Sequence, residues 1–295
     1  MKSGLIRISI ILFFVLLIAA SAVSGDILDA MSWPSEDASL LRNFGANDRG
    51  DPVLGMVFGG GTEVLAAETG EVIFRRTKND PASRLPSPLG AWTAVDHSDG
   101  LISIYSRYAT STIGSHVEKQ QPIAVCGTSG WSNREGFYFM LFDRRDRRWI
   151  NPAMIITPVQ ETRAPQIFSV DLVNSQGQLM QSRSLSQGRY TVIVNAAGGT
   201  RLNGSAPSIP YAPQKIVCSV NGAEVGALNF EAISARDGVS MVFRNGLVSA
   251  KQIYARFPAY EAAEVFLTRG QVTLEVIVQD ITGTSRSVVN RLTVN

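Results

Sequence analysis

The sequence has little charge, and the charge that it has is nearly balanced. Charged residues make up 18% of the 295 positions, and the formal net charge is +2. A dedicated nucleic-acid-binding protein normally carries a strong basic excess, so this class is excluded. A disordered chain is excluded as well, because 45% of the residues are hydrophobic. A chain of this length has enough apolar residues for two cores, and we expect two folded domains.

Cysteine and histidine are also scarce, at two residues each. Cys126 and Cys218 lie in apolar stretches typical of separate buried strands, and their spacing matches no metal motif. We expect buried free thiols, although an exported protein leaves a disulfide between them open. His97 is expected at a strand end with local hydrogen bonds, and His116 on an exposed hairpin. Nothing in the sequence brings the two histidines together as a metal site.

The N-terminus has the features of a secretory signal. Lys2 and Arg7 precede an apolar stretch over residues 8–20, and a small-residue processing site follows at residues 20–22. The stretch is shorter than the roughly 20 apolar residues that a transmembrane helix needs. We therefore expect residues 1–22 to be a signal peptide and the protein to be exported to the periplasm or cell envelope. The alternative is an uncleaved signal, which would be the only contact with the membrane.

Long helical stripes are absent from the sequence, which predicts an all-β fold. Short runs of β-branched and aromatic residues recur between clusters of Gly, Asn, Asp and Pro. Only Asp37–Asn43 is predicted as a short helix. The predicted strands are Glu71–Phe74, Trp92–Val95, Ile102–Tyr105, Ile123–Cys126, Phe137–Phe142, Gln166–Val173, Arg189–Val194, Ile216–Val220, Val225–Phe230, Val272–Gln279 and Val288–Val294.

Two prolines, Pro158 and Pro165, bracket a polar segment that is typical of a short linker. This break predicts one domain over residues 30–158 and a second over residues 165–295. Several strands separated by turns predict a β-sandwich in the second domain. Asn221-Gly222 is a strong signal for a two-residue hairpin between two of these strands.

An ordered set of segments in the first domain resembles the LytM/lysostaphin-type zinc endopeptidases, which cleave peptidoglycan. Residues 61–72 look like the family's G-T-x-V-x-A-x-x-x-G-x-V segment, and residues 95–108 resemble its H-x-x-G and Y-x-H-L stretch. Residues 114–130 are similar to its glycine-rich run around Ile-Ala, and residues 151–152 match the Asn-Pro that closes the domain. The resemblance implies the family's LytM-like β-sheet fold, a duplicated hybrid motif, for residues 30–158.

The second domain resembles the immunoglobulin-like (Ig-like) β-sandwiches that accompany degenerate LytM domains in some bacterial envelope proteins. This similarity rests on the strand pattern and the predicted hairpin. The Cys-Trp-Cys pattern of true immunoglobulin domains is missing from residues 165–295. The similarity implies a role in presentation or docking.

The positions that carry the family's chemistry are replaced in this chain. The family binds zinc through H-x-x-x-D and the second histidine of H-x-H, and the other H-x-H histidine and that of Y-x-H assist the attacking water. Here the H-x-x-x-D frame falls on Val53 and Val57, and the H-x-H frame falls on Gly136 and Tyr138. The Y-x-H histidine is Arg107. Catalytic zinc needs three protein donors, and with two histidines in the whole chain no shift of the alignment restores the family's four.

The resemblance therefore implies a pseudoenzyme with no metal ligands and no cofactor. The candidate residues of its binding groove are Arg107, Tyr138 and His97, of which Tyr138 is expected to line an aromatic floor. The charged segment Asp143–Arg148 is predicted as a solvated turn with internal charge pairing. The alternative for this segment is arginine contact with acidic wall polymer.

Three functions stay open on the sequence alone. The favoured one is an exported, non-catalytic envelope protein that binds peptidoglycan or regulates a cell-wall hydrolase. The second is an active metalloendopeptidase that cleaves peptidoglycan cross-links, and it alone requires zinc. The third is a structural envelope scaffold.

Overall fold

The computed structural model describes residues 31–77, 86–156, 164–199 and 210–295. The predicted signal peptide and most of the predicted linker lie outside the described residues. Strands hold 56% of the chain and helices 3%, which confirms the all-β class. Within the described part, none of the helices has both the length and the apolar character needed to cross a membrane.

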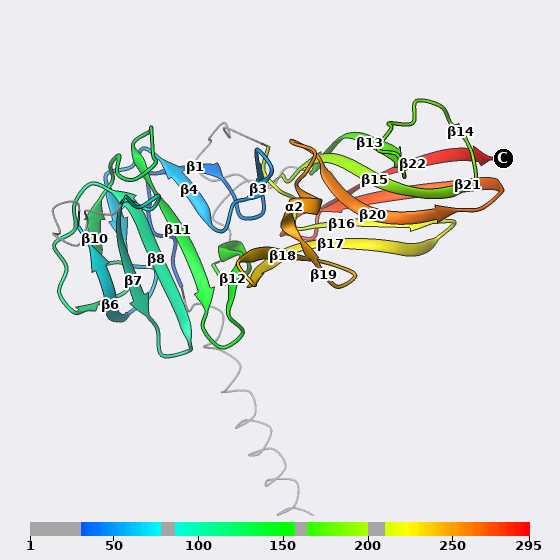
Figure 1. The fold of residues 1–295 in the computed structure, drawn as a ribbon. Helices are drawn as coiled ribbons and strands as arrows, with labels where there is room; N and C mark the ends of the chain where they lie inside the picture. The colour runs from blue at the N-terminus through cyan, green and yellow to red at the C-terminus, as the bar shows by residue number, and fades with distance from the viewer. Residues whose placement is uncertain (1–30, 78–85, 157–163, 200–209) are drawn as a thin grey trace, which may run out of the picture.

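The N-terminal half is built on a twisted antiparallel sheet (Figure 1). Its strands, in spatial order, are β4 (Met56–Gly59), β11 (Gly136–Asp143), β8 (Leu101–Tyr108), β7 (Ala91–Asp96) and β6 (Gly70–Arg76). Successive side chains of a strand face opposite sides of a sheet. Phe137, Phe139 and Leu141 of β11 belong to the core of this half. Tyr138 and Met140 face the other way, into an apolar cluster that continues into the C-terminal half.

Short strands complete the N-terminal half. They are β1 (Ser39–Arg42), which pairs with β4; β2 (Asn47–Asp48), which pairs with β3 (Asp51–Pro52); β5 (Glu63–Leu65), which pairs with β10 (Pro122–Val125); and β9 (His116–Val117), which pairs with β6. Val64 of β5 and Ile123 of β10 belong to the same core as Phe139. This small sheet therefore closes the core side of the main sheet.

The short helix predicted over Asp37–Asn43 is wrong. Residues 39–42 of this segment form β1, in which Leu40 pairs with Phe58 and is only 2% exposed. A seven-residue helix is marginal by itself. Pairing with β4 buries Leu40 and gives the backbone its hydrogen-bond partners, so tertiary contacts decide the conformation.

The C-terminal half is a two-layered β-sandwich, as predicted. One layer consists of β13 (Gln166–Asn174), β15 (Gly188–Ala197) and β20 (Tyr260–Leu267). The other consists of β14 (Ser184–Leu185), β22 (Ser285–Val294), β21 (Gly270–Gln279), β16 (Lys215–Val220), β17 (Ala223–Arg236), β18 (Val239–Arg244) and β19 (Leu247–Ser249), followed by the short helix α2 (Ala250–Ile253). Val192, Val194, Ile216 and Val276 fill the space between the layers.

The predicted hairpin at Asn221-Gly222 is confirmed. The two residues connect β16 to β17 and have φ values of 52° and 83°. Positive φ at both central residues is the mark of a type I′ turn, whose twist matches that of the flanking strands.

One strand joins the two halves into a continuous sheet. β12 (Arg148–Ile150) pairs with β11 on one side and with β17 on the other. The 3₁₀ turn η2 (Pro152–Met154) follows it, capped by the side chain of Asn151. The side-chain nitrogen of Asn151 also donates to the carbonyl oxygen of Phe230, at 3.2 Å. The two halves therefore share backbone pairing as well as side-chain contacts (Figure 1).

Candidate functional site

The structure brings four of the five replaced positions together on one face of the N-terminal sheet. Val57 of β4 is paired with Tyr138 of β11, and Tyr138 is paired with the residue before Arg107 on β8. The guanidinium carbon of Arg107 lies 4.9 Å from the centroid of the Tyr138 ring. Val53 belongs to the same apolar cluster as Tyr138. The residues that the sequence resemblance predicts at the family's zinc site, two valines, a tyrosine and an arginine, therefore lie close together.

The fifth position, Gly136, has a backbone that excludes any side chain. Its φ is +147°, which L-residues rarely adopt, and a Cβ there would overlap the carbonyl oxygen of Phe58 on the paired strand. Gly59 faces Gly136 in the ladder, so the two chains approach closely at this point. A histidine at residue 136 would require the strands to move apart, so a metal ligand here conflicts with the packing as well as with the residue type.

Tyr138 is a buried, neutral hydroxyl. Its Oη accepts a hydrogen bond from the backbone nitrogen of Leu54, at 3.0 Å. Burial raises the pKa of Tyr138 to about 12, against the opposing effects of this bond and of the Arg107 charge. The tyrosine therefore stays protonated at neutral pH. It ties the loop that carries Val53 to the centre of the sheet.

Arg107 is the one charged group among these positions, and its environment is unusual. Its φ is +67°, a region that few residues other than glycine adopt. Its Nε is buried and has no hydrogen-bond acceptor among the described residues. Burial lowers the pKa of Arg107 below its ordinary value, although a guanidinium remains charged at physiological pH. The residue as a whole is only partly buried.

Half-buried apolar side chains extend this face beyond Tyr138. Met140 of β11 is paired with Ile104, and Phe142 is paired with Ile102 on one side and with Trp149 on the other. The rings of Phe142 and Trp149 meet edge to face at 5.0 Å between centroids. We call this set, Ile102, Ile104, Phe142 and Trp149, the apolar floor. The period-two alternation of apolar residues in β8 and β11 indicates this set, but the sequence analysis singled out only Tyr138.

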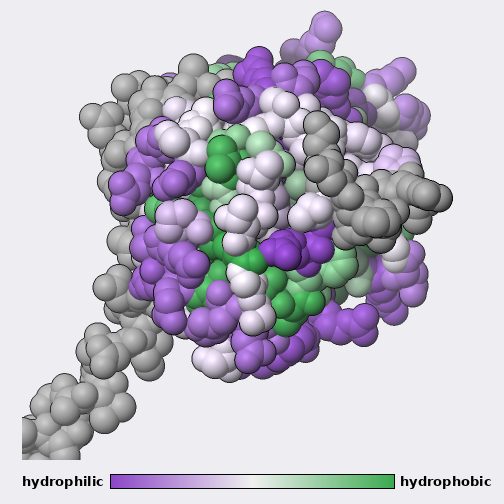
Figure 2. Space-filling view, turned by 90° about the vertical axis from the view of Figure 1, so that its left-hand side faces the viewer, coloured by the Kyte–Doolittle hydropathy of each residue, from purple (hydrophilic) through white to green (hydrophobic). Residues whose placement is uncertain are grey.

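Hydrophobic surface is also visible farther along the N-terminal half. Figure 2 shows a hydrophobic area ringed by hydrophilic side chains on the side that lies to the left in Figure 1. Near the sheet edge, Phe74 of β6 stacks on Trp92 of β7 at 4.2 Å between centroids, and Phe74 is 46% exposed. Trp131, in the loop before β11, is 76% exposed. Exposed aromatic side chains of this kind are common in contact surfaces.

His97 does not belong to the groove, which corrects its place among the candidate groove residues. It is 3% exposed and lies beside Thr69 and Ser103. Its Nδ1 donates to the Thr69 carbonyl oxygen and its Nε2 accepts from the Ser103 hydroxyl, both at 2.9 Å. Ser103 is three residues from Ser106 along β8 and so faces the opposite side of the sheet from Tyr138. The locally hydrogen-bonded strand-end histidine expected from the sequence is confirmed.

The remaining histidine and the cysteines lie elsewhere. His116 is exposed on β9, with its Nε2 at 3.2 Å from Glu118, as expected for a hairpin residue. Cys126 and Cys218 are buried free thiols in different halves, and burial raises their pKa values to about 11 and about 12. Among the described residues, no cluster of three or more His, Cys, Asp or Glu side chains is placed to hold a metal ion.

The turn Asp143–Arg148 carries internal charge pairs, which confirms the first of its two interpretations. Arg148 contacts Asp146 at 2.7 Å, and Arg145 lies 3.8 Å from Asp143. Arg144 reaches Asp96 on β7, also at 2.7 Å. The arginines of this turn are therefore largely occupied within the protein.

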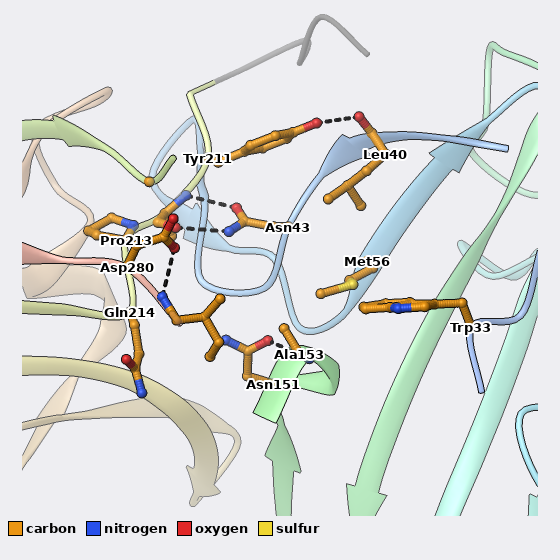
Figure 3. A pocket seen from close by; sticks show the side chains of 13 residues that line it. Trp33, Leu40, Asn43, Met56, Asn151, Ala153, Tyr211, Pro213, Gln214 and Asp280 are labelled. Carbon is orange, nitrogen blue, oxygen red and sulfur yellow. Dashed lines mark hydrogen bonds between the residues drawn. The ribbon is translucent and has the colours of Figure 1, made fainter. Parts of the chain in front are cut away.

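A small pocket lies at the junction of the two halves (Figure 3). The side chain of Asn43 exchanges two hydrogen bonds with the backbone of Ala212, at 2.8 and 2.7 Å, and the Tyr211 hydroxyl donates to the carbonyl oxygen of Leu40. The space that water can enter is about 30 Å³, enough for about two water molecules. The pocket is therefore a joint between the halves and is too small for an organic ligand.

Comparison with known proteins identifies relatives of both halves. The sequence model described as Peptidase family M23 matches residues 55–152, which confirms the resemblance of this half to the LytM-type proteins. A second family model, which names no function, matches residues 164–295. Murein hydrolase activator EnvC of Escherichia coli (strain K12) is 35% identical over 125 residues, which are 41% of this chain and 27% of EnvC. The chain thus matches little more than a quarter of that relative.

Solved structures give weaker similarities. The SpoIIQ–SpoIIIAH pore-forming complex aligns with a TM-score of 0.35 and 19% identity over 44% of this chain and 92% of that chain. The solution structure of lysostaphin aligns with a TM-score of 0.36 and 16% identity over 74% of this chain and 87% of that chain. The catalytic domain of the M23 protein EnpA from Enterococcus faecalis aligns with a TM-score of 0.33 and 21% identity, over 41% and 94%. Similarities of this size carry no argument about function.

Proposed function

We propose that the chain is an exported, non-catalytic regulator of a cell-wall hydrolase, since residues 55–152 match the sequence model of peptidase family M23. The observation that carries the proposal is the set of residues at the positions predicted for the zinc site. Val57 and Tyr138 are cross-strand neighbours where a metal site would require donors, and Gly136 has no room for a side chain. The scaffold is retained while every position of the catalytic set is replaced.

Two observations favour regulation of a hydrolase over the other roles: the similarity to EnvC and the partly exposed apolar side chains. EnvC is by its name a murein hydrolase activator, and it is 35% identical to this chain over 125 residues. The half-buried Ile104, Phe142 and Trp149 suit contact with a protein. Completing the burial of one such side chain contributes up to about 1.5–3 kcal/mol. Under this proposal the protein acts in the periplasm or cell envelope and uses no zinc.

Binding to peptidoglycan is the second part of the proposal. Trp131 is 76% exposed and Arg107 is partly exposed, and aromatic and arginine side chains are suited to stacking on sugars and to pairing with peptide carboxylates. A regulator that also holds the wall would keep its hydrolase beside the substrate. Contact with the hydrolase nevertheless remains the principal activity proposed.

The test combines metal analysis with a hydrolysis assay. The purified chain is analysed for zinc and then mixed with isolated sacculi, alone and together with a purified wall amidase. We expect no stoichiometric zinc, no release of wall fragments by the chain alone, and faster release by the amidase when the chain is present. One zinc per chain with cleavage of sacculi by the chain alone would establish the endopeptidase instead. A chain with no effect on the amidase and no affinity for sacculi would leave the scaffold role.

A further inference from the structure

The loop at the far end of the C-terminal sandwich is fixed at several points. Residues 175–187, which we call the end loop, leave β13, run beside β22 as β14 and return to β15 (Figure 1). The N–H of Met180 donates to the carbonyl oxygen of Leu172 at 2.8 Å, and the N–H of Gln187 donates to the carbonyl oxygen of Asn295 at 3.1 Å. The end loop therefore has a defined shape, although most of its side chains are exposed.

Two hollows lie against the end loop. The first, of about 640 Å³, is lined by the loop itself. The second, of about 600 Å³, lies on the outer face of the sheet formed by β13, β15 and β20. The two hollows share Asn174, Ser175, Arg189 and Tyr190, so one ligand can contact both. Each has the size of a small-molecule site, which spans roughly 300–1,000 Å³.

Neutral polar side chains line the first hollow. Among the described residues that form it none is acidic, and Arg189 is the single basic one. Amide and hydroxyl side chains both donate and accept hydrogen bonds, as do the hydroxyl and acetamido groups of a sugar. Most of the lining surface is polar, whereas the centre of a protein contact is mostly apolar. The polar side chains include Ser175, Gln176, Gln181, Ser182, Ser186 and Gln187.

The second hollow adds an exposed ring and an unpaired positive charge. Phe266 of β20 and Arg189 of β15 are cross-strand neighbours, and Phe266 is 57% exposed. The carboxylate of Glu264, which also lines this hollow, pairs with Arg244 at 3.0 Å. Arg189 is exposed and has no ion-pair partner within the described parts of the chain. The local excess is therefore the single positive charge of Arg189.

A ligand that suits both hollows presents hydroxyl or acetamido groups, an apolar ring face and a single negative charge. We propose that the two hollows bind an acidic carbohydrate, whose sugar ring packs on Phe266 and whose carboxylate pairs with Arg189. An aromatic ring offers a large apolar surface to a sugar ring, and the guanidinium fork matches the two oxygens of a carboxylate. The site lies at the opposite end of the sandwich from the junction with the N-terminal half (Figure 1). It goes beyond the proposed function and does not depend on it.

A titration with three saccharides tests the ligand class. The ¹⁵N-labelled chain is titrated with N-acetylmuramic acid, with N-acetylglucosamine, which lacks the carboxylate, and with trigalacturonate, and its amide signals are followed by NMR. We expect saturable shifts at Gln181, Gln187 and Arg189 with at least one of the two acids, and binding of N-acetylglucosamine weaker by about tenfold or more. Tighter binding of N-acetylmuramic acid would assign the site to peptidoglycan, and tighter binding of trigalacturonate to a polysaccharide of uronic acids. No saturable shift with either acid, or N-acetylglucosamine bound as tightly as the acids, would overturn the proposal.

Variants test the two named contacts. With the tighter-binding acid, we expect an affinity loss of about tenfold or more for Arg189→Gln, a smaller loss for Arg189→Lys, which keeps the charge without the fork, and a clear loss for Phe266→Ala. Arg286→Gln and Phe243→Ala are the matched controls, since both residues are exposed and lie outside the two hollows. Near-ultraviolet circular dichroism shows whether each variant is folded. Wild-type affinity in folded Arg189→Gln, or an equal loss in the controls, would refute the site.

The hydrolase assay keeps this inference apart from the proposed function. Arg189→Gln should change the rate of the wall amidase as the wild type does, because Arg189 lies far from the N-terminal half. A wild-type chain without effect on the amidase would refute the proposed regulator, and the saccharide titration would still decide the carbohydrate site.

Discussion

Single residues at the groove are constrained by backbone geometry as well as by chemistry. Gly136 lies in the predicted H-x-H frame, and its positive φ and its closeness to Phe58 leave no room for a side chain. Val57, on the paired strand, is half-buried and contributes only packing. Restoring the family's residue types would therefore not by itself restore a metal site.

Replacing Gly136 by histidine is expected to destabilise the protein by about 2–5 kcal/mol, because backbone strain and overpacking add. Gly60→Ala is the matched control, since Gly60 has a φ of +67° but nothing within 4 Å of an added Cβ. That variant isolates the backbone cost, about 1 kcal/mol. Urea unfolding measures both. Equal stability of the two variants would show that strands β4 and β11 separate easily, contrary to the packing described here.

Buried tyrosines make the stability depend on alkaline pH. Burial raises the pKa values of Tyr105 and Tyr138 to about 12, from about 10 in an unfolded chain. Between these values the unfolded state loses protons that the folded state keeps, so stability is full below about pH 10 and falls as the pH rises. The loss is on the order of 2–3 kcal/mol for each tyrosine by about pH 12.

The variant Tyr138→Phe should show a shallower decline of stability above about pH 10, because one of the titrating hydroxyls is absent. Below that pH it should be less stable by about 1–2 kcal/mol, since the Leu54 N–H loses its acceptor. Urea midpoints measured across this pH range give both quantities. A decline as steep as that of the wild type would mean that Tyr138 is not buried in the folded protein.

The elements beside the groove depend on the C-terminal half for their positions. Asn47 of β2, on the loop that joins β1 to β4, donates to the carbonyl oxygens of Tyr254 and Ala259, at 3.3 and 3.0 Å. The Tyr254 hydroxyl donates to Gly45 at 2.8 Å. The same loop continues to Leu54, which is bonded to Tyr138. The sandwich therefore holds the loop that packs on Tyr138.

Asn47→Ala should lower the free energy of unfolding by about 2–4 kcal/mol, because two buried carbonyl groups lose their donor. Hydrogen exchange should quicken at the amides of Val53 and Leu54, which the loop positions beside Tyr138. Asn174→Ala is the control, since Asn174 also bonds to turn backbone but lies at an exposed turn. Unchanged hydrogen exchange at Leu54 in Asn47→Ala would show that the position of the loop does not depend on its bonds to the sandwich.

Local patterns predicted the regular elements well and the irregular ones poorly. Every strand predicted from alternation lies within or overlaps an observed strand, and the turn at Asn221 is as expected. Among the strands that were missed, β4 and β12 are short and β20 is interrupted by charge, and β1 was predicted as a helix. These strands exist because of partners far away in sequence, which a local pattern does not contain.

The candidate site could also be predicted from the sequence in part. The replaced positions Val57, Arg107 and Tyr138 could be found by residue type and order, and the structure brings them together. The strained backbone of Arg107 and the exclusion of a side chain at Gly136 depend on paired strands and carry no sequence signal. His97 was misplaced because its side of the sheet depends on the register of β7 and β8.

The whole molecule is one cooperative unit in this structure. Phe44 and Ala46 of the N-terminal half are buried in the same cluster as Phe230 and Tyr254 of the C-terminal half. β12 adds backbone pairing between β11 and β17. An interface that shares both a core and a ladder makes independent unfolding of the halves unfavourable.

Calorimetry of the intact chain is therefore expected to show a single transition with equal calorimetric and van't Hoff enthalpies. Residues 31–156 expressed alone should lack cooperative unfolding, because Phe44 and Ala46 lose the partners that bury them. Tryptophan fluorescence in urea measures this for the fragment. Two separate transitions in the intact chain, or a sharp transition in the fragment, would show that the junction is weak.

The strand β12 also has a mechanical consequence. Its hydrogen bonds to β11 and β17 form a ladder that runs from the groove to the sandwich without a hinge. A force applied to the C-terminal sandwich is then carried by rows of backbone hydrogen bonds. The two halves turn together as one rigid body. A partner that holds the sandwich therefore sets the direction in which Arg107 and Tyr138 face.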